Sequence, residues 1–404
     1  MQLATDWKRS TCNIVSFLVI LAMTALSINA NAGSCIIDGD IRYQSIDGFG
    51  CSSAWCGQFS SAKNYALYNT LGFSLLRVRI DPWGSSSNGR WDAEKNNASA
   101  AHSYGAEVLG TPWTPPPWYK DNNDYIGGSL LSSYYSNYAN WLNGAASYID
   151  LDYVSIQNEP DIDVTYESCD WTPTQLLSFC QNNAGSINIP VLMPESYQFN
   201  DSYSDPTLNN AAARNNIDII GGHIYGSGLY THTNALNYGK KVWMTEHFRD
   251  GANDINNCVA IAKEISDCMN ASMSAYFWWW ANDDDSDVNL VTNGGTINKN
   301  AYTIGQFAKW VVPGKQRISC TYQPTSGVYV TAYRNYGVVI VAVNTTDNYV
   351  WQTFSIKNLG GFTSMQVHRT AASLNMEYMG TSTFSGDTFG MYLWPKSIST
   401  AHQF

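Results

Sequence analysis

The sequence predicts a (β/α)8 barrel with an attached antiparallel β-sandwich, and two observations support this prediction. Between residues 47 and 312, eight short apolar runs alternate with helix-like stretches, at spacings that leave room for one helix between neighbouring runs. After residue 313 the helix-like stretches stop, and strand-like runs separated by turn residues continue to residue 404. The first region is about 265 residues long, close to the roughly 250 residues typical of such barrels.

The barrel prediction depends on eight candidate strands. In chain order they are GFGCSS, SLLRVRI, AEVLGT, YVSIQNE, PVLMPES, DIIGGHIY, KVWMTE and SAYFWWW. A helix should begin at Pro173, because Thr172 and Gln175 have the pattern of a capping box around a proline at the first helical position. A doubly wound open sheet is the competing fold, but no G-x-G-x-x-G motif follows the first strand.

The β-sandwich is predicted over residues 313–404. Its strand-like runs are VYVTAYRN, GVVIVAVNTT, VWQTFSIKN, MQVHRTAAS and FGMYLWP. The segment SCIIDGDIRYQSI, within residues 33–46, is also strand-like, and we expect it to join this second domain. Cys35 and Cys320 would then link the two pieces. No Ser/Gly/Pro-rich linker separates the barrel from the sandwich, which predicts that the two are docked.

Residues 1–32 have the pattern of a signal peptide. Lys8 and Arg9 precede an apolar run, and the small residues Ala30 and Ala32 place the cleavage before Gly33. A membrane anchor is the alternative, but the run is about 15 residues, short of the roughly 20 needed to span a bilayer. We therefore expect a secreted, extracellular protein that acts as a monomer.

The composition excludes some classes of partner. The chain has a net charge of −11, and removal of residues 1–32 makes it one unit more negative. Such a chain is repelled by nucleic acid and by anionic membranes. Charged residues are only 14% of the chain and aromatic residues another 14%, a balance that favours neutral, hydroxyl-rich ligands.

Eight cysteines remain after residue 32, and an even number in an exported chain predicts disulfide bonds. Cys51 and Cys56 are close enough in sequence to close a small loop. Cys258 and Cys268 lie in a helix-like stretch, about 15 Å apart, too far to be bridged. No C-x-x-C or H-E-x-x-H pattern is present, so we expect no metal site.

Three glutamates fall at the ends of predicted barrel strands, where barrel enzymes place their functional groups. They are Glu159, Glu195 and Glu246. Pro160 disfavours helical backbone at Glu159, and we expect an extended residue that aims its side chain out of the mouth. Strands four and seven lie across the mouth from each other, so Glu159 and Glu246 could face one ligand.

Two facing carboxyl groups are what glycoside hydrolysis requires, one as acid and one as nucleophile. Arg77 and Arg79 lie two residues apart on strand two, so both side chains point the same way and one could hold Glu246 ionised. Tyr225, at the end of strand six, could hydrogen-bond the same carboxylate.

Each of these residues also has a structural interpretation. Glu195 could be only a hydrogen-bond acceptor, and His223 and His247 could be polar core residues. At least one of the three strand-eight tryptophans should belong to the core, because neighbouring strand residues alternate between faces. A carbohydrate-binding protein without activity is the alternative from another class. A serine hydrolase is disfavoured because no G-x-S-x-G occurs.

The chain resembles the xylanase branch of glycoside hydrolase family 30. The motifs SIQNEPD, IIGGHIYG, WMTEH, LRVRIDP, GTPWTPPPW, YESCDW and NKNAYTIGQFAKWVVPG carry the resemblance. It implies a retaining hydrolase of β-1,4-linked xylan or xylo-oligosaccharides that needs no cofactor, with Glu159 as acid/base and Glu246 as nucleophile. The substrate-binding and supporting residues are then Asn158, Trp55, Arg77, Arg79, Trp113, Tyr225, Trp278, Trp279 and Trp280.

The sequence departs from glucuronoxylan-specific members of the family after strand eight. Those members carry an arginine there, whereas this chain reads ANDDDSDVN and has no Arg or Lys between Tyr276 and Lys299. Asp283, Asp284, Asp285 and Asp287 predict an acidic rim and an enzyme that does not require a glucuronate branch.

Several alternatives remain for this rim. Arg249 could reach a glucuronate branch from the neighbouring loop, or the aspartates could form a solvated turn or an incomplete calcium loop. A glucuronoxylan-specific xylanase and another family 30 β-glycosidase are therefore the alternative functions.

Overall fold

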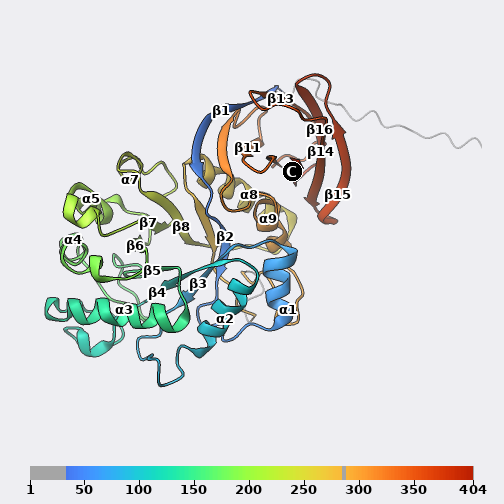
Figure 1. Cartoon of the computed structure of the whole chain (residues 1–404). Helices are drawn as coiled ribbons and strands as arrows, with labels where there is room; N and C mark the ends of the chain where they lie inside the picture. The colour runs from blue at the N-terminus through green and yellow to red at the C-terminus, as the bar shows by residue number, and fades with distance from the viewer. Residues whose placement is uncertain (1–32, 284–287, 404) are drawn as a thin grey trace, which may run out of the picture.

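The computed structural model describes residues 33–283 and 288–403, and it confirms the predicted fold class. Eight parallel strands close into a barrel in sequence order, and a second, mostly antiparallel sheet lies beside it (Figure 1). The barrel strands are β2 (Gly48–Ser52), β3 (Leu75–Arg79), β4 (Glu107–Thr111), β5 (Tyr153–Ser155), β6 (Val191–Ser196), β7 (Ile219–His223), β8 (Lys241–His247) and β9 (Ala275–Trp278). Residues 1–32, the predicted signal peptide, lie outside the described residues.

Helices follow the barrel strands and form its outer layer. They are α1 (Ser61–Asn64), η1 (Tyr65–Thr70), α2 (Asp92–Ser103), η2 (Pro117–Tyr119), η3 (Ser132–Tyr134), α3 (Tyr135–Ile149), α4 (Pro173–Asn182), η4 (Ala184–Ser186), α5 (Asp201–Asn209), α6 (Ala211–Arg214), α7 (Thr233–Asn237), α8 (Ile255–Asn270) and α9 (Lys299–Ala308). The helix predicted at Pro173 begins there, with the capping box of Thr172 and Gln175 formed in both directions.

The lower interior of the barrel is apolar. Its buried side chains are Leu75, Leu109, Leu192, Ile219, Trp243, Ala275 and Phe277. These side chains come from six strands. Because side chains alternate between the two faces of a strand, the residue two positions after each of them also points into the barrel. Leu75 is thus followed by Arg77 on β3, so the polar mouth is built directly on this apolar layer.

The second domain is one nine-stranded sheet, in the order β15-β14-β17-β12-β11-β10-β1-β13-β16. Its strands are β1 (Cys35–Ser45), β10 (Gln316–Cys320), β11 (Val328–Arg334), β12 (Val338–Asn344), β13 (Val350–Lys357), β14 (Ser364–Ala371), β15 (Leu374–Thr383), β16 (Thr388–Leu393) and β17 (Ser397–Gln403). The sheet curls so that its two edge strands meet, and the hydroxyl of Ser382 on β15 donates to the Gly390 carbonyl on β16 at 2.7 Å. Strand β1 pairs antiparallel with β10 and parallel with β13.

Helices α8 and α9 lie between the barrel and the second domain (Figure 1). One buried core joins the two, since Ile261 of α8 and Val341 of β12 belong to the same apolar cluster. The side chain of Gln306 donates to Thr370 at 3.0 Å, and the Thr400 hydroxyl donates back to Gln306 at 2.6 Å. The second domain is therefore packed onto the barrel.

The eight described cysteines are present as free thiols, so the predicted disulfide bonds are not formed in this structure. Cys35 and Cys320 lie on the paired strands β1 and β10, whereas Cys258 and Cys268 lie within α8. Among residues 33–283 and 288–403, we find no helix with the length and apolar character needed to cross a bilayer.

Candidate active site

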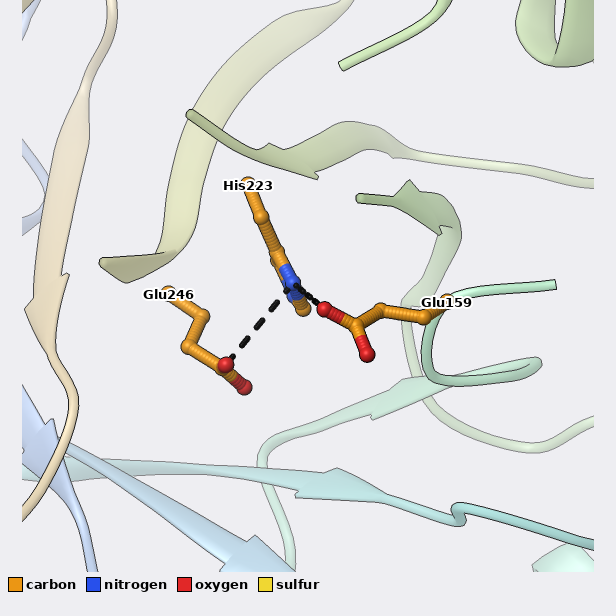
Figure 2. Close-up of side chains that lie close together, drawn as sticks. All are labelled: Glu159, His223 and Glu246. Atoms are coloured by element: carbon orange, nitrogen blue, oxygen red, sulfur yellow. Dashed lines mark hydrogen bonds and ion pairs between the residues drawn. The ribbon is translucent and has the colours of Figure 1, made fainter. Parts of the chain in front are cut away.

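Two carboxyl groups face each other at the mouth of the barrel. Glu159 follows β5 and Glu246 lies near the end of β8, and both side chains are buried. His223, the last residue of β7, lies between them (Figure 2). One carboxylate oxygen of each glutamate and a ring nitrogen of His223 all lie within 4.8 Å of one another.

Glu246 accepts two strong hydrogen bonds. Nη1 of the fully buried Arg77 lies 2.6 Å from its Oε2, and the Tyr225 hydroxyl donates to its Oε1 at 2.9 Å. Tyr225 and one of the two arginines of β3 are the partners predicted for this carboxylate. Both bonds stabilise the ionised carboxylate, which is the form a nucleophile needs.

Arg77 also holds Glu195 and Asn158 in place. Its Nε lies 3.1 Å from Glu195 Oε1, and its Nη2 donates to Asn158 Oδ1 at 2.6 Å. Burial alone would raise the pKa of Glu195, but the charge of Arg77 and the contacts with His223 lower it to about 2. Glu195 is therefore ionised at neutral pH and positions Arg77, in line with its structural interpretation.

Glu159 is held by three donors. The Tyr166 hydroxyl donates to Oε2 at 2.9 Å, His223 Nδ1 lies 2.9 Å from Oε1, and Asn158 Nδ2 donates to Oε2 at 3.4 Å. The expected extended backbone at Glu159 is wrong, because its φ is +44°, in the left-handed region. This strained conformation is fixed by tertiary contacts, including a bond from the Glu159 amide to the Glu195 carbonyl at 3.0 Å.

His223 is the functional residue whose role the sequence analysis missed. It was considered only as a polar core residue, although it ends a barrel strand as the glutamates do. Burial lowers the pKa of His223, but the charge of Glu246, the hydrogen bond to Glu159 and the Glu195 carboxylate 3.9 Å from Nε2 together raise it to about 10. The ring is therefore an imidazolium at neutral pH, with Nδ1 directed at Glu159.

The two facing glutamates and His223 form one proton-binding system. Burial raises the pKa of Glu159, but the hydrogen bond and charge of His223 outweigh burial and lower it. At Glu246, burial outweighs the charges of His223 and Arg77, so its pKa lies above the ordinary value. Because neighbouring carboxyl groups titrate together, the proton that the site carries is shared by the group rather than owned by one residue.

The same three side chains have the donor types of a metal site, so we tested that arrangement. Arg77 is already 2.6 Å from Glu246, and His223 Nδ1 already contacts Glu159 at 2.9 Å. A divalent cation among them would meet both a buried guanidinium and an imidazolium. The arrangement fits proton sharing better than metal binding.

The carboxyl pair lies in a cleft of about 570 Å³ whose walls are mainly aromatic. The lining residues are Trp55, Trp113, Glu159, Tyr166, Tyr197, Tyr225, Glu246, Phe248, Asp250, Trp279 and Trp280. The rings of Trp55 and Trp113 lie 4.8 Å apart, and Trp279 lies 5.8 Å from Trp113. Arg77 lies under this wall, 4.7 Å from the Trp113 ring.

The three strand-eight tryptophans have two different roles. Trp279 and Trp280 line the cleft and stack on each other at 5.0 Å. Trp278 has no exposed surface, and its indole donates to the Val288 carbonyl at 2.7 Å behind the strand. Its assignment as a substrate-binding residue is therefore wrong, because strand alternation turns it into the core.

Arg79 lies one layer above Arg77 and does not reach Glu246. Its guanidinium pairs with Glu167 at 2.5 Å and with Asp81 at 3.1 Å, and it lies 5.0 Å from the Trp55 ring. Arg79 thus supports the wall of the cleft.

The predicted acidic rim is only partly described. Asp283 is exposed, but its carboxylate is paired with the buried Lys63 at 2.5 Å and accepts the Asn293 amide at 2.6 Å. Asp284, Asp285 and Asp287 lie outside the described residues. Arg249 lies 3.7 Å from Glu264 and lines a second pocket of about 430 Å³.

Comparison with known proteins now connects this site to a family. A family model described as "Glycosyl hydrolase family 59" matches residues 92–311, which lie within the barrel. Glucuronoxylanase XynC of Bacillus subtilis (strain 168) is 32% identical, over 97% of this chain and 98% of its own length. The structure of the glycoside hydrolase family 30 subfamily 8 xylanase Xyn30A from Clostridium acetobutylicum is 37% identical, with a TM-score of 0.87 over 91% of this chain and 99% of that chain.

The chain belongs to glycoside hydrolase family 30, within its xylanase branch. These relatives match across both domains, whereas the family 59 model is confined to part of the barrel. A GH30 endoxylanase from Clostridium papyrosolvens C71 is similar too, at 36% identity and a TM-score of 0.84, over 91% of this chain and 99% of that chain. This protein is therefore a glycoside hydrolase, and the resemblance to family 30 that its sequence motifs indicated is confirmed.

Proposed function

We propose that this family 30 enzyme hydrolyses β-1,4-xylosidic bonds in xylan with retention of anomeric configuration. The observation that carries the proposal is the pair of Glu159 and Glu246, which bring carboxylate oxygens within 4.8 Å of each other in an aromatic cleft. Retaining glycosidases hold their two carboxyl groups about 5–5.5 Å apart, whereas inverting enzymes leave about 6.5–9.5 Å for a water molecule. The separation supports direct attack by one carboxylate.

In the first step, Glu246 attacks the anomeric carbon and forms a glycosyl ester. The glycosidic bond to the leaving oxygen breaks, and Glu159 transfers a proton to that oxygen. Glu246 reacts as the carboxylate that Arg77 and Tyr225 stabilise at 2.6 and 2.9 Å.

In the second step, a water molecule attacks the same carbon from the side of the departed group. Glu159 takes a proton from the water, the ester bond breaks, and Glu246 is released as a carboxylate. Glu159 therefore alternates between acid and base within one turnover.

His223 explains how Glu159 can serve as an acid although its own pKa is lowered. His223 Nδ1, which carries the imidazolium proton, lies 2.9 Å from Glu159 Oε1, so the two residues carry one transferable proton between them. When a glycosidic oxygen withdraws that proton, the dyad retains a neutral ring and a carboxylate. The loss of the proton to solvent is then governed by the dyad, not by Glu159 alone.

The substrate assignment rests on the relatives and on the cleft. The relatives named above are a glucuronoxylanase and two xylanases. Tryptophan faces such as those of Trp55, Trp113 and Trp279 suit the flat, unsubstituted faces of xylose rings. Product analysis on linear, arabinose-branched and glucuronate-branched xylan tests the assignment, and failure to cleave any of the three would contradict it.

We propose further that the enzyme does not require a glucuronate branch. The charged side chains among the described residues lining the cleft are Glu159, Glu246 and Asp250, and all of them are acidic. Arg249, the cation considered for this role, points to Glu264. We expect comparable turnover on linear xylan and glucuronoxylan at matched salt. A strong preference for glucuronoxylan, with the branch at a fixed position in every product, would contradict this.

Export is also a proposal, supported by the pattern of residues 1–32. N-terminal sequencing of enzyme recovered from culture medium should begin at Gly33. An exported chain meets oxidising conditions, and the neighbouring strands of Cys35 and Cys320 make them the pair we expect to form a disulfide. Alkylation and mass spectrometry, with and without reduction, would show two additional thiols after reduction.

A further inference from the structure

Two exposed tryptophans stand on the same face of the barrel as the carboxyl pair, outside the cleft. Trp83 lies in the loop after β3, and Trp118 in η2, after β4. Their rings are 5.7 Å apart at an angle of 54°. Although they contact each other, they remain 43% and 50% exposed. Single exposed apolar side chains are common on protein surfaces, whereas exposed apolar side chains that contact each other more often mark a binding surface.

Local hydrogen bonds fix the loop of Trp83. Its backbone amide donates to Asp81 Oδ1 at 2.8 Å, and the Asn88 side chain donates to its carbonyl at 2.7 Å. Asp81 is itself held by Arg79 at 3.1 Å and by Arg90 at 3.6 Å. These contacts largely neutralise the charge beside the ring.

An aromatic stack supports Trp118 from the other side. Trp118 lies 5.9 Å from Tyr119, whose ring stacks on Tyr134 at 4.9 Å. Both tryptophans are therefore placed by the fold before any ligand arrives, which lowers the entropy cost of binding.

The pair is linked to the cleft wall through Arg79 and Asp81. Trp55 and Tyr166 form part of the cleft wall, and Arg79 connects this wall to Asp81. Arg79 lies 5.0 Å from the Trp55 ring and binds Glu167, the residue after Tyr166, at 2.5 Å. Two residues beyond Asp81 the chain reaches Trp83. A polymer lying in the cleft along this wall is led towards the pair.

We propose that Trp83 and Trp118 form a distal sugar platform, which stacks on a neutral stretch of the xylan chain beyond the cleft. The proposal rests on the proposed function, because the platform takes the same polymer. Apolar ring faces, fixed loops and neutralised charge favour an uncharged pyranose chain over an anionic one. Because neither tryptophan is among the residues that line the cleft around the carboxyl pair, the platform contributes to the binding of long substrates and not to bond cleavage.

The test compares a polymer with a short substrate. The variants are W83A, W118A and the double variant, and W351A on β13 is the matched control, since Trp351 is 42% exposed on the other domain. On soluble linear xylan we expect the KM of the double variant to rise about five- to tenfold with kcat retained. On 4-nitrophenyl β-xylobioside, a short substrate with only two sugar rings, kcat/KM should stay within about twofold of the parent. W351A should match the parent on both substrates.

Three results would overturn the platform. The first is an unchanged KM on polymeric xylan. The second is an equal loss on both substrates or a lower melting temperature, which would mean that the pair only supports the loops. The third is a concentration-dependent dimer in sedimentation that the double variant abolishes, which would make the surface a contact between two copies.

A binding assay separates this proposal from the proposed function. In native electrophoresis, a gel that contains linear xylan should slow the migration of the E246Q variant. Adding W83A and W118A to E246Q should reduce this retardation. If the parent enzyme cleaves no xylan and is nonetheless retarded through the pair, the proposed function fails and the platform stands. If the parent cleaves xylan and the pair has no effect on retardation, the platform fails alone.

Discussion

The lower and upper halves of the barrel interior come from the same strands but differ in chemistry. The lower half is filled by apolar side chains such as Leu192 and Trp243. Two to four residues further along those strands, the interior carries Arg77, Glu195, Glu246 and His223, all of them buried. The lower layer removes apolar surface from water and stabilises the fold. The upper layer keeps charges buried, which is costly unless they are paired or used.

The difference shows where function is placed in this fold. The upper charges are paired with one another, yet Glu246 and the neighbouring Glu159 also line an open cleft. A layer required only for stability would not keep Glu159 in left-handed backbone at φ +44°. We therefore expect substitutions in the upper layer to change activity before stability, and substitutions in the lower layer to do the reverse.

The largest effect is expected from Glu246→Gln in the upper layer. The amide cannot form the glycosyl ester, so turnover should fall by at least about 10⁴-fold while binding of xylo-oligosaccharides is largely retained. Steady-state kinetics and calorimetric titration measure the two quantities. The control is Glu107→Gln, at the opposite end of the barrel on β4, which should keep parental activity. Substantial residual turnover in E246Q would remove Glu246 from the nucleophile role.

A large effect on stability is expected from Leu192→Ala in the lower layer. Leu192 is fully buried on β6, so the lost contacts and the cavity should reduce the free energy of unfolding by about 2–5 kcal/mol. Denaturant unfolding measures the change, and the partly exposed Leu131 provides the control L131A. The kcat of folded L192A should remain near the parental value. A folded variant that loses activity without losing stability would break the distinction between the layers.

Glu195→Gln tests which part of the upper layer is structural. Because the pKa of Glu195 is lowered from its ordinary 4.5 to about 2, its charge stabilises the folded state above pH 4.5, and this stability is lost as pH falls towards 2. The full contribution is about 3 kcal/mol by linkage. Unfolding measured between pH 2 and 7 should show a weaker acid destabilisation in E195Q, from a lower starting stability. An identical pH dependence in both proteins would show that Glu195 is not ionised by Arg77.

A smaller effect is expected from His223→Asn, and it concerns pH. The His223–Glu159 dyad loses its shared proton only as pH approaches the raised pKa of His223, about 10. Without the imidazolium, Glu159 must hold the proton alone, so the alkaline limb of kcat/KM should move to lower pH by at least about one unit. The acid limb, governed by Glu246, should move less.

The control for that shift is His232→Asn. His232 is also buried and paired with a carboxylate, Asp201 at 2.6 Å, but it lies outside the cleft. Its pH profile should match the parent. An unmoved alkaline limb in H223N would show that the dyad does not share the acid proton.

The sequence was sufficient for the strand order and for the two facing glutamates. Short apolar runs between helix-like stretches locate the strands, and carboxylates at strand ends must meet at a barrel mouth. His223 also lies at the end of a strand, so the sequence places it at the mouth as well. A single histidine in a sequence does not show which charges surround it, however, and the raised pKa of His223 depends on three glutamates from different parts of the chain. Residue spacing also could not show that Asp283 turns inward to Lys63, 220 positions earlier in the chain.

The tryptophans illustrate the same limit. Alternation predicts that one of three consecutive residues enters the core, yet it does not identify Trp278 as that residue. Its position depends on the register of β9 against β8, where a bulge follows Met244. A shift of one residue in this register would turn every side chain of the strand to the other face.

The central claim is that Glu246 attacks the sugar directly, and the anomer released first tests it most directly. Proton NMR should follow the hydrolysis of a xylo-oligosaccharide from the first minutes, before mutarotation mixes the anomers. A double displacement through the carboxyl pair, whose oxygens lie within 4.8 Å, releases the β anomer first. Initial release of the α anomer would require a water molecule between the two groups and would contradict the account.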